Sequence, residues 1–529
     1  MQNIALVIIL LAVITALAEI TDKIKIPYPI LLVLTGIGIG LFPGLPSINM
    51  DPEIIFLVFL PPILYEAAWA TSWSDFKKAK RPITMLAIGC VIFTTCAVAW
   101  IAHTFIHGLG WAEAFVLGAI ISPPDAVAAT SATKGLDLPK RVTAILEGES
   151  LVNDATGLIA YRYAIAAVVT GTFSILDAGL KFILVAFVGI LIGLVVGYIF
   201  KWIHKITPDN PTNDTTLTLL APYVAYLSAE AIHMSGVLAV VTAGLYLSRN
   251  SSLIFSKQTR LQATGAWNTI IFLLNGLVFI LIGLQLNQIM GNIKGLPPTA
   301  LLVYGGVVSL AVIIGRIIWV FPGTYLPRLL SKKIRETEAR PSPRLVTIVA
   351  WSGMRGVVSL AAALALPLTI REGVPFPNRD LIIFLTFCVI FSTLILQGLT
   401  LRPLINWLGI KSDGSEHRSE KEARLQLASG VIEHIEEAYS LSLSDEALNQ
   451  IKTKYEIRIQ RLRKGLPDDL TVGSVQVKEF HRIQQEILEK ERRDVIALRN
   501  KGTINDEVLR KIEYELDLEE TRLMLEQRM

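Results

Sequence analysis

The sequence predicts an all-α polytopic membrane protein with thirteen transmembrane helices and a helical cytoplasmic tail. Of its 529 residues, 52% are hydrophobic and only 18% are charged, whereas soluble domains are about one quarter charged. Mean hydropathy is +0.53. The apolar residues form runs that match a hydrocarbon core of about 30 Å, which a helix of about 20 residues crosses. This composition excludes a disordered chain, a disulfide scaffold and an ordinary soluble enzyme.

Thirteen apolar runs are candidate transmembrane spans, and the second and ninth are the shortest. The expected spans are residues 2–20, 27–45, 53–70, 83–106, 111–132, 141–169, 176–203, 215–232, 236–249, 267–287, 299–323, 344–367 and 380–408. The first run has an alternative interpretation as a signal peptide, because Ala16-Leu17-Ala18 is similar to a cleavage site. A helix is favoured, because no basic segment precedes the run and Lys23 follows it.

Basic residues near the span ends predict the orientation. If the N-terminus is outside, the loops on the cytoplasmic side carry twenty Lys and Arg residues. The opposite loops and their margins carry four, namely Lys181, Lys294, Arg371 and Arg379. Cytoplasmic loops of membrane proteins are enriched in Lys and Arg. We therefore expect a multi-pass protein of the cell (inner) membrane, with its N-terminus outside and its C-terminal tail in the cytoplasm.

Charge also divides the chain into two domains. Residues 411–529 contain 46 charged side chains among 119 residues, while residues 1–410 hold the other 48. We expect a transmembrane domain over 1–410 and a cytoplasmic helical tail over 411–529. In the tail, helical periodicity covers roughly 420–463, 474–499 and 503–528. It predicts a small bundle or coiled-coil element, with a regulatory module as the alternative.

Several ionisable residues lie inside the apolar spans, where a charge costs a few kcal/mol or more and is a functional candidate by default. Ser150 and Asp154 are four residues apart and therefore share one helix face. Glu149 lies on another face, from which it can reach a different helix. Asp125, in the fifth span, adds a second carboxylate. Hydroxyl and carboxylate oxygens suit a hard cation, and sodium, lithium and potassium stay open.

Two of these spans contain signals for an interrupted helix. Pro123 and Pro124 remove two backbone donors in mid-membrane, and Gly353 and Gly356 flank Arg355. Non-helical backbone at membrane depth occurs where it lines a cavity. Interrupted helices at matching positions of two halves are typical of secondary transporters. Two inverted repeats of six spans would place spans 5 and 12 in register, a hypothesis without support from a residue-level repeat.

At these residues the chain resembles the monovalent cation:proton antiporter family, in its bacterial sodium/proton exchanger branch. Four motifs carry the resemblance across residues 1–410. They are the Leu-Pro-Pro-Ile-Leu stretch that leads to Glu66, the interrupted span with Asp125, Gly-Glu-Ser-Leu-Val-Asn-Asp at 148–154 and Gly-Met-Arg-Gly at 353–356. The resemblance implies a transporter that exchanges Na⁺, with Li⁺ or K⁺ as alternatives, for H⁺. It also implies a homodimer and a role in pH and sodium homeostasis.

The resemblance also implies roles for individual residues. Asp154 would be the essential carboxylate that binds either the cation or a proton. Asp125, Ser150 and the carbonyl of Pro124 would complete the cation shell, with Glu66 close by. The ion-binding set also includes one further residue, Asn153, which precedes Asp154 and marks the electroneutral branch.

The resemblance implies structural roles for three other charged residues. Glu149 would form an ion pair with Arg316, and Arg355 would offset the helix dipoles of the crossing, interrupted helices. One departure affects the cation shell, since many family members have Thr before the aspartate where this chain has Pro124. A hydroxyl ligand is therefore missing.

Other function classes are less well supported by the sequence. A passive cation channel would share the acidic residues but need no proton coupling. A membrane-anchored sensor would use the tail as its output. We find no nucleophile–base pair and no metal motif that would indicate an enzyme. No resident cofactor is expected beyond the transported Na⁺ and H⁺, and a net charge of +4 gives no reason to expect a nucleic-acid partner. We expect the lipid bilayer to surround the transmembrane domain.

Overall fold

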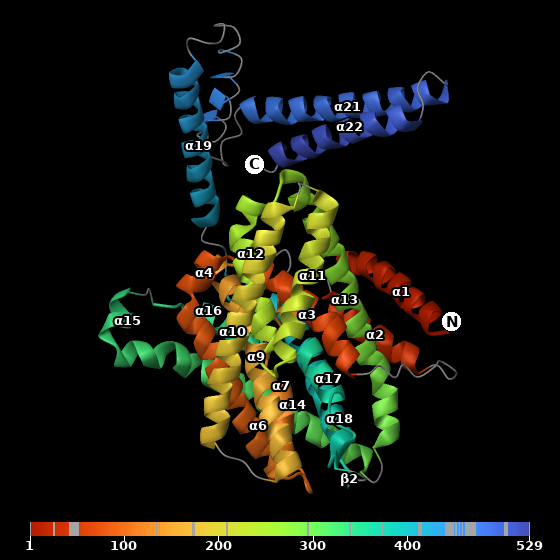
Figure 1. The fold of residues 1–529 in the computed structure, drawn as a ribbon, viewed down its shortest axis with the longest axis vertical. Helices are drawn as coiled ribbons and strands as arrows, with labels where there is room; N and C mark the ends of the chain where they lie inside the picture. The colour runs from red at the N-terminus through yellow and green to blue at the C-terminus, as the bar shows by residue number, and fades with distance from the viewer. Residues whose placement is uncertain are drawn as a thin grey trace. The chain divides into compact units, whose positions relative to one another are not determined.

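The computed structural model divides the chain into two compact units, residues 1–413 and 414–529. It describes residues 2–24, 27–41, 52–133, 136, 138–171, 175–207, 210–293, 296–337, 340–371, 374–410, 415–439, 449, 452–453, 455–456, 459–460, 472–501 and 506–527. The described part of the chain is mostly helical (Figure 1).

Within the first unit, one group of helices packs together, and each of these helices runs without a break. We call this group the continuous bundle. Small side chains on its helices, among them Ala225, Ala239 and Ala243, are fully buried and let neighbouring helices approach closely. The bundle consists of α1 (Gln2–Ile24), α2 (Tyr28–Gly40), α3 (Pro52–Ala70), α10 (Ile175–Ile206), α11 (Pro211–Glu230), α12 (Gly236–Ile254) and α13 (Lys257–Asn292).

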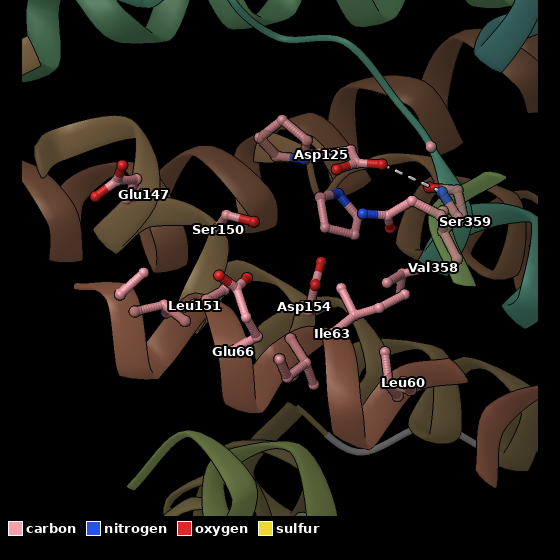
Figure 2. Close-up of a pocket in the computed structure, with 18 residues that line it drawn as sticks. Leu60, Ile63, Glu66, Asp125, Glu147, Ser150, Leu151, Asp154, Val358 and Ser359 are labelled. Atoms are coloured by element: carbon pink, nitrogen blue, oxygen red, sulfur yellow. Dashed lines mark hydrogen bonds between the residues drawn. The ribbon is translucent and has the colours of Figure 1, made fainter. Parts of the chain in front are cut away.

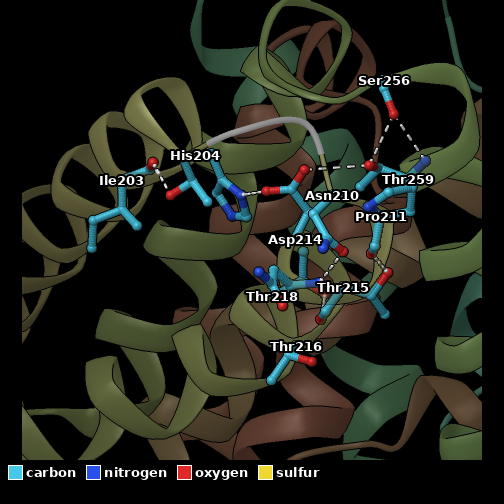
Figure 3. A network of polar contacts seen from close by, with 12 residues as sticks. Ile203, His204, Asn210, Pro211, Asp214, Thr215, Thr216, Thr218, Ser256 and Thr259 are labelled. Atoms are coloured by element: carbon cyan, nitrogen blue, oxygen red, sulfur yellow. Dashed lines mark hydrogen bonds and ion pairs between the residues drawn. The ribbon is translucent and has the colours of Figure 1, made fainter.

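A polar network joins three helices at one end of the continuous bundle (Figure 3). Nδ1 of His204, on α10, lies 2.8 Å from Oδ1 of Asp214, on α11. The hydroxyl of Thr259, on α13, donates to the other oxygen of Asp214 at 3.3 Å. All three side chains are buried, and because each has a partner, the cost of burying them is reduced.

The remaining helices of the first unit form the interrupted bundle, named for two breaks in its helices. It consists of α5 (Lys80–Thr84), the π-helical turn η1 (Met85–Cys90), α6 (Val91–Phe105), α7 (Trp111–Ile121), α8 (Ala126–Thr133), α9 (Lys140–Thr170), α14 (Pro298–Leu330), α16 (Pro343–Trp351), α17 (Val357–Leu364) and α18 (Arg379–Trp407). Two short helices, α4 (Trp73–Lys78) and α15 (Lys332–Thr337), flank it.

Both predicted interruptions are present, and they contact each other. The helix that contains α7 and α8 is broken between Ile121 and Ala126, around the two prolines that lack backbone N–H groups. The second break separates α16 from α17. The backbone N–H of Asp125 donates to the carbonyl of Met354 at 2.7 Å. This bond satisfies backbone groups that a continuous helix would have paired internally.

Among the described residues, six helices are long and apolar enough to cross a membrane. They are Lys80–Phe105, Ala178–Ile206, Gly236–Ile254, Lys257–Gly291, Pro298–Leu330 and Arg379–Trp407. The first unit is therefore a multi-pass membrane protein. The described residues also contain a feature that an all-α fold does not predict, an antiparallel pair of short strands, β1 (Thr369–Arg371) and β2 (Val374–Pro375).

In the second unit, residues 449, 452–453, 455–456 and 459–460 are helical. Three longer helices are described in full, namely α19 (Ser415–Tyr439), α21 (Val472–Asn500) and α22 (Asp506–Gln527). The last two correspond to the stretches expected at 474–499 and 503–528. They lie side by side as an antiparallel hairpin (Figure 1). Leu488, Leu516 and Leu523 form its apolar contact, and Arg492 pairs with Asp517 at 2.6 Å.

Candidate functional site

A cavity of about 260 Å³ lies between the two bundles. The interrupted bundle lines it with residues of α9, of the 123–125 break and of α17, and the continuous bundle lines it with α3 and Asn275 of α13. Along α9 the lining residues run from Glu147 to Asp154. Figure 2 shows the side chains of Asp154, Ser150 and Glu66 facing this common space.

The cavity collects five of the sequence-predicted ion-binding residues. Asp154 and Ser150 come from α9, Asp125 and Pro124 from the break, and Glu66 from α3. Asp154 is 6% exposed. A buried carboxylate is costly unless it is paired, protonated or bound to a cation. The arrangement therefore offers carboxylate, hydroxyl and carbonyl oxygens to a desolvated hard cation.

Asn153 lies outside the cavity lining, although it is adjacent to Asp154. Its side chain is fully buried, and its Nδ2 donates to the carbonyl of Pro124 at 2.8 Å. The bond connects α9 to the broken segment and satisfies a carbonyl at the break. Asn153 therefore positions the segment that presents Asp125.

Asp125 is held by the second break. The backbone N–H of Val357, the first residue of α17, donates to Oδ2 of Asp125 at 3.3 Å (Figure 2). A helix N-terminus stabilises a carboxylate through its free N–H groups and its dipole. A Cβ added to Gly356 would lie 1.7 Å from the same oxygen. Only glycine at this position leaves room for the carboxylate.

Glu149 and Arg316 form a fully buried ion pair. The guanidinium of Arg316 donates through two nitrogens to the two oxygens of Glu149, at 2.6 and 2.8 Å. It also donates to the carbonyl of Val349 in the last turn of α16, at 3.0 Å. A Cβ at Gly353 would lie 2.3 Å from Cδ of Arg316. The pair therefore connects α9, α14 and the end of α16.

Arg355 lies within the second break and is completely buried. Its backbone N–H donates to the hydroxyl of Thr393 at 3.1 Å, which anchors the break to α18. Among the described residues, none of its three guanidinium nitrogens has a hydrogen-bond partner. Arg355 does not line the cavity, so the structure does not bring it into the cation site.

Three polar cavity residues, Glu147, Asn275 and Ser359, were not predicted as site residues. Asn275 is 4% exposed, and its Oδ1 has no hydrogen-bond partner among the described residues. Its only sequence signal is one amide within an apolar run. Ser359, on α17, is also buried and unpartnered in the described structure. Its signal was its position three residues after Gly356.

Known proteins resemble this chain over most of its length. A family model described as "sodium/hydrogen exchanger, transmembrane" matches residues 8–407. A protein named as an uncharacterised Na⁺/H⁺ exchanger from Mycobacterium tuberculosis is 32% identical over 99% of this chain and 96% of its own length. A sodium, potassium, lithium and rubidium/H⁺ antiporter from Bacillus pumilus is 35% identical over 76% of this chain and 61% of its own.

Solved structures show a similar fold. The sodium proton antiporter MjNhaP1 from Methanocaldococcus jannaschii superposes with a TM-score of 0.59 and 23% sequence identity. The match covers 75% of this chain and 98% of that one. The fold of this chain is therefore similar to that of a solved sodium proton antiporter.

Proposed function

The chain belongs to the sodium/hydrogen exchanger family, and from this membership we propose how its cavity exchanges a monovalent cation for a proton. The observation that carries the proposal is the position of Asp154, which is buried in a cavity between two bundles beside Asp125 and Ser150. One carboxylate that binds either a proton or a cation couples the two fluxes, because each ligand must leave before the other binds.

The cation shell in this proposal consists of Asp154, Asp125 and Ser150, with the Pro124 carbonyl and Glu66 at its edge. Asn153 acts on the shell indirectly, through its bond to the Pro124 carbonyl. Exchange of one cation for one proton at Asp154 is electroneutral. Na⁺ is the principal substrate, and the name of the Bacillus pumilus relative makes Li⁺ and K⁺ reasonable additional substrates.

Alternating access follows from the division into bundles. Asp154, Ser150 and Asp125 all belong to the interrupted bundle, so a bound cation travels with it when it moves against the continuous bundle. The Glu149–Arg316 pair holds the moving part together, and Arg355 offsets the helix dipoles at the break. We propose thirteen spans in inverted repeats with crossing interrupted helices.

The proposed setting is the cell membrane, with a homodimer as the working unit. The N-terminus is outside, and residues 411–529 form a cytoplasmic domain. In the cell, such exchange would serve pH and sodium homeostasis. No cofactor takes part in the proposed cycle. A passive channel is disfavoured by family membership, and it would conduct cations without any pH gradient.

Proteoliposomes that contain a pH-sensitive dye test this function. Wild-type protein should dissipate an imposed pH gradient when Na⁺ is added, at a rate that clamping the membrane potential leaves unchanged. Asp154→Asn should abolish the response, because an amide cannot carry the exchanged proton. Asp75→Asn, a change in the short helix α4 away from the cavity, is the matched control and should exchange normally. Full exchange by Asp154→Asn would refute the assignment.

A further inference from the structure

An ion pair outside the cation site joins the two bundles. Nη2 of Arg162, on α9, donates to both carboxylate oxygens of Glu230, on α11, at 2.7 and 2.6 Å. Both side chains are partly exposed. Because α9 belongs to the interrupted bundle and α11 to the continuous bundle, this contact breaks whenever the two bundles move apart by a few ångströms.

Glu230 is fixed by its own bundle. Its Oε1 accepts a hydrogen bond from the backbone N–H of Gly236 at 3.4 Å, and Gly236 is the first residue of α12. A carboxylate at a helix N-terminus is stabilised by the helix dipole and by the free N–H groups. The continuous bundle therefore holds a carboxylate in place, ready for a cation from the other bundle.

Arg162 is attached rigidly to the cation site. It lies on the same uninterrupted helix as Asp154, eight residues further along, a separation of about 12 Å at the helical rise per residue. The α9 residues that line the cavity run from Asp154 in the opposite direction, to Glu147. Arg162 therefore lies beyond the Asp154 end of the cavity lining, and any shift of Asp154 along the helix axis also moves Arg162.

We propose that Arg162 and Glu230 form a latch that closes the bundles beyond the Asp154 end of the cavity and that must open in every transport cycle. Both are positioning residues, because neither contacts the cavity that would hold the cation. The proposal rests on the antiport function proposed above. It assigns to this pair the control of which side of the membrane reaches Asp154.

Reversible crosslinking tests whether the latch opens. In a background with Cys90, Cys96 and Cys388 replaced by Ala, Arg162→Cys with Glu230→Cys would be treated with a short bis-methanethiosulfonate reagent. A direct disulfide would be too short, because the long side chains of Arg162 and Glu230 hold the two backbones further apart than a disulfide spans. Sodium-driven proton exchange in proteoliposomes should fall at least ten-fold on crosslinking and recover on reduction.

A pair inside one bundle gives the matched control. Lys201, on α10, donates to Asn250, on α12, at 2.8 Å, and both helices belong to the continuous bundle. Lys201→Cys with Asn250→Cys, crosslinked with the same reagent, should keep its exchange rate. If the crosslinked Arg162–Glu230 pair also keeps its rate, the latch is refuted while the antiport function stands. If wild-type protein shows no exchange, the antiport function itself fails.

A neutral variant should change the KM for Na⁺ differently on the two sides of the membrane, which a purely structural role would not do. Glu230→Gln removes the carboxylate charge. It should favour the state in which the site is open beyond the Asp154 end, where the latch lies. The apparent KM for Na⁺ should then fall on the membrane side nearer Arg162 and rise on the side nearer Glu147. A change of about two- to five-fold is expected for the loss of a partly exposed ion pair that biases two states. Inside-out and right-side-out vesicles measure the two values. Equal or unchanged KM values on both sides would overturn the proposal.

Discussion

The two bundles of the first unit use buried polar groups differently. In the continuous bundle, His204, Asp214 and Thr259 bond to one another at one end and away from the cavity. In the interrupted bundle, Asp154 and Asp125 face a cavity, and the helices break where these residues meet. Asp154 is as buried as His204, Asp214 and Thr259, so burial alone does not identify a transport site. The difference lies in whether the polar groups satisfy one another or leave oxygens directed into a cavity.

The largest effect should come from Gly356, where the second break meets Asp125. Gly356→Ala places a Cβ where the carboxylate lies, 1.7 Å from Oδ2, so Asp125 must move out of the cation shell. We expect at least a hundred-fold loss of exchange, consistent with a loss of about 3 kcal/mol or more of binding or transition-state energy. Dye-loaded proteoliposomes measure it. Gly306→Ala on α14, where an added Cβ meets nothing within 4 Å, should exchange like wild type.

Glu149 should matter for stability more than for ion binding. Glu149→Gln leaves the Arg316 guanidinium buried without its carboxylate, and breaking a buried pair in this way costs about 3–5 kcal/mol. We expect a large fall in the Tm of the protein in detergent, measured by intrinsic fluorescence. Removing the charge at both positions, with Arg316→Met added, should recover part of the loss. A Tm equal to that of wild type in the single variant would refute a structural role.

How far the sequence predicts this site depends on whether a signal is local. Pro123-Pro124 shows the first break directly, and helical geometry alone places Glu149 on a different face from Asp154. The bond from Asn153 to the Pro124 carbonyl is not visible in the sequence, because it joins positions 29 residues apart. The apolar runs at 111–132, 141–169 and 344–367 do predict the spans that carry the site, although each of the first and third is divided into two short helices in the structure.

A change in the continuous bundle should separate stability from transport. Asp214→Asn removes the charge that joins His204 to Thr259, and disturbing a buried hydrogen-bonded group costs about 1–3 kcal/mol. Tm should therefore fall, while the KM for Na⁺ of the protein that remains folded stays at the wild-type value. A changed KM would show that this network acts on the cation site, contrary to the distinction drawn between the bundles.

Asn275 should give the smallest effect, because it would approach the cation from the continuous bundle. Its Oδ1 is buried and unpartnered among the described residues, as expected of an oxygen available to a cation or its water. Asn275→Ala should raise the KM for Na⁺ up to about ten-fold, the value of one ordinary hydrogen bond. Tm should change little. A lower Tm with an unchanged KM would instead assign Asn275 to helix packing.

Proton release on sodium binding tests the central claim most directly, namely that one carboxylate binds either ion. Purified full-length protein would be titrated with NaCl in a calorimeter, in two buffers that differ in ionisation enthalpy, at a pH where the site is protonated. About one proton should be released per Na⁺ bound, because the two ligands compete for Asp154, and Asp154→Asn should release none. Sodium binding without proton release in the wild type, or unchanged release in the variant, would contradict it.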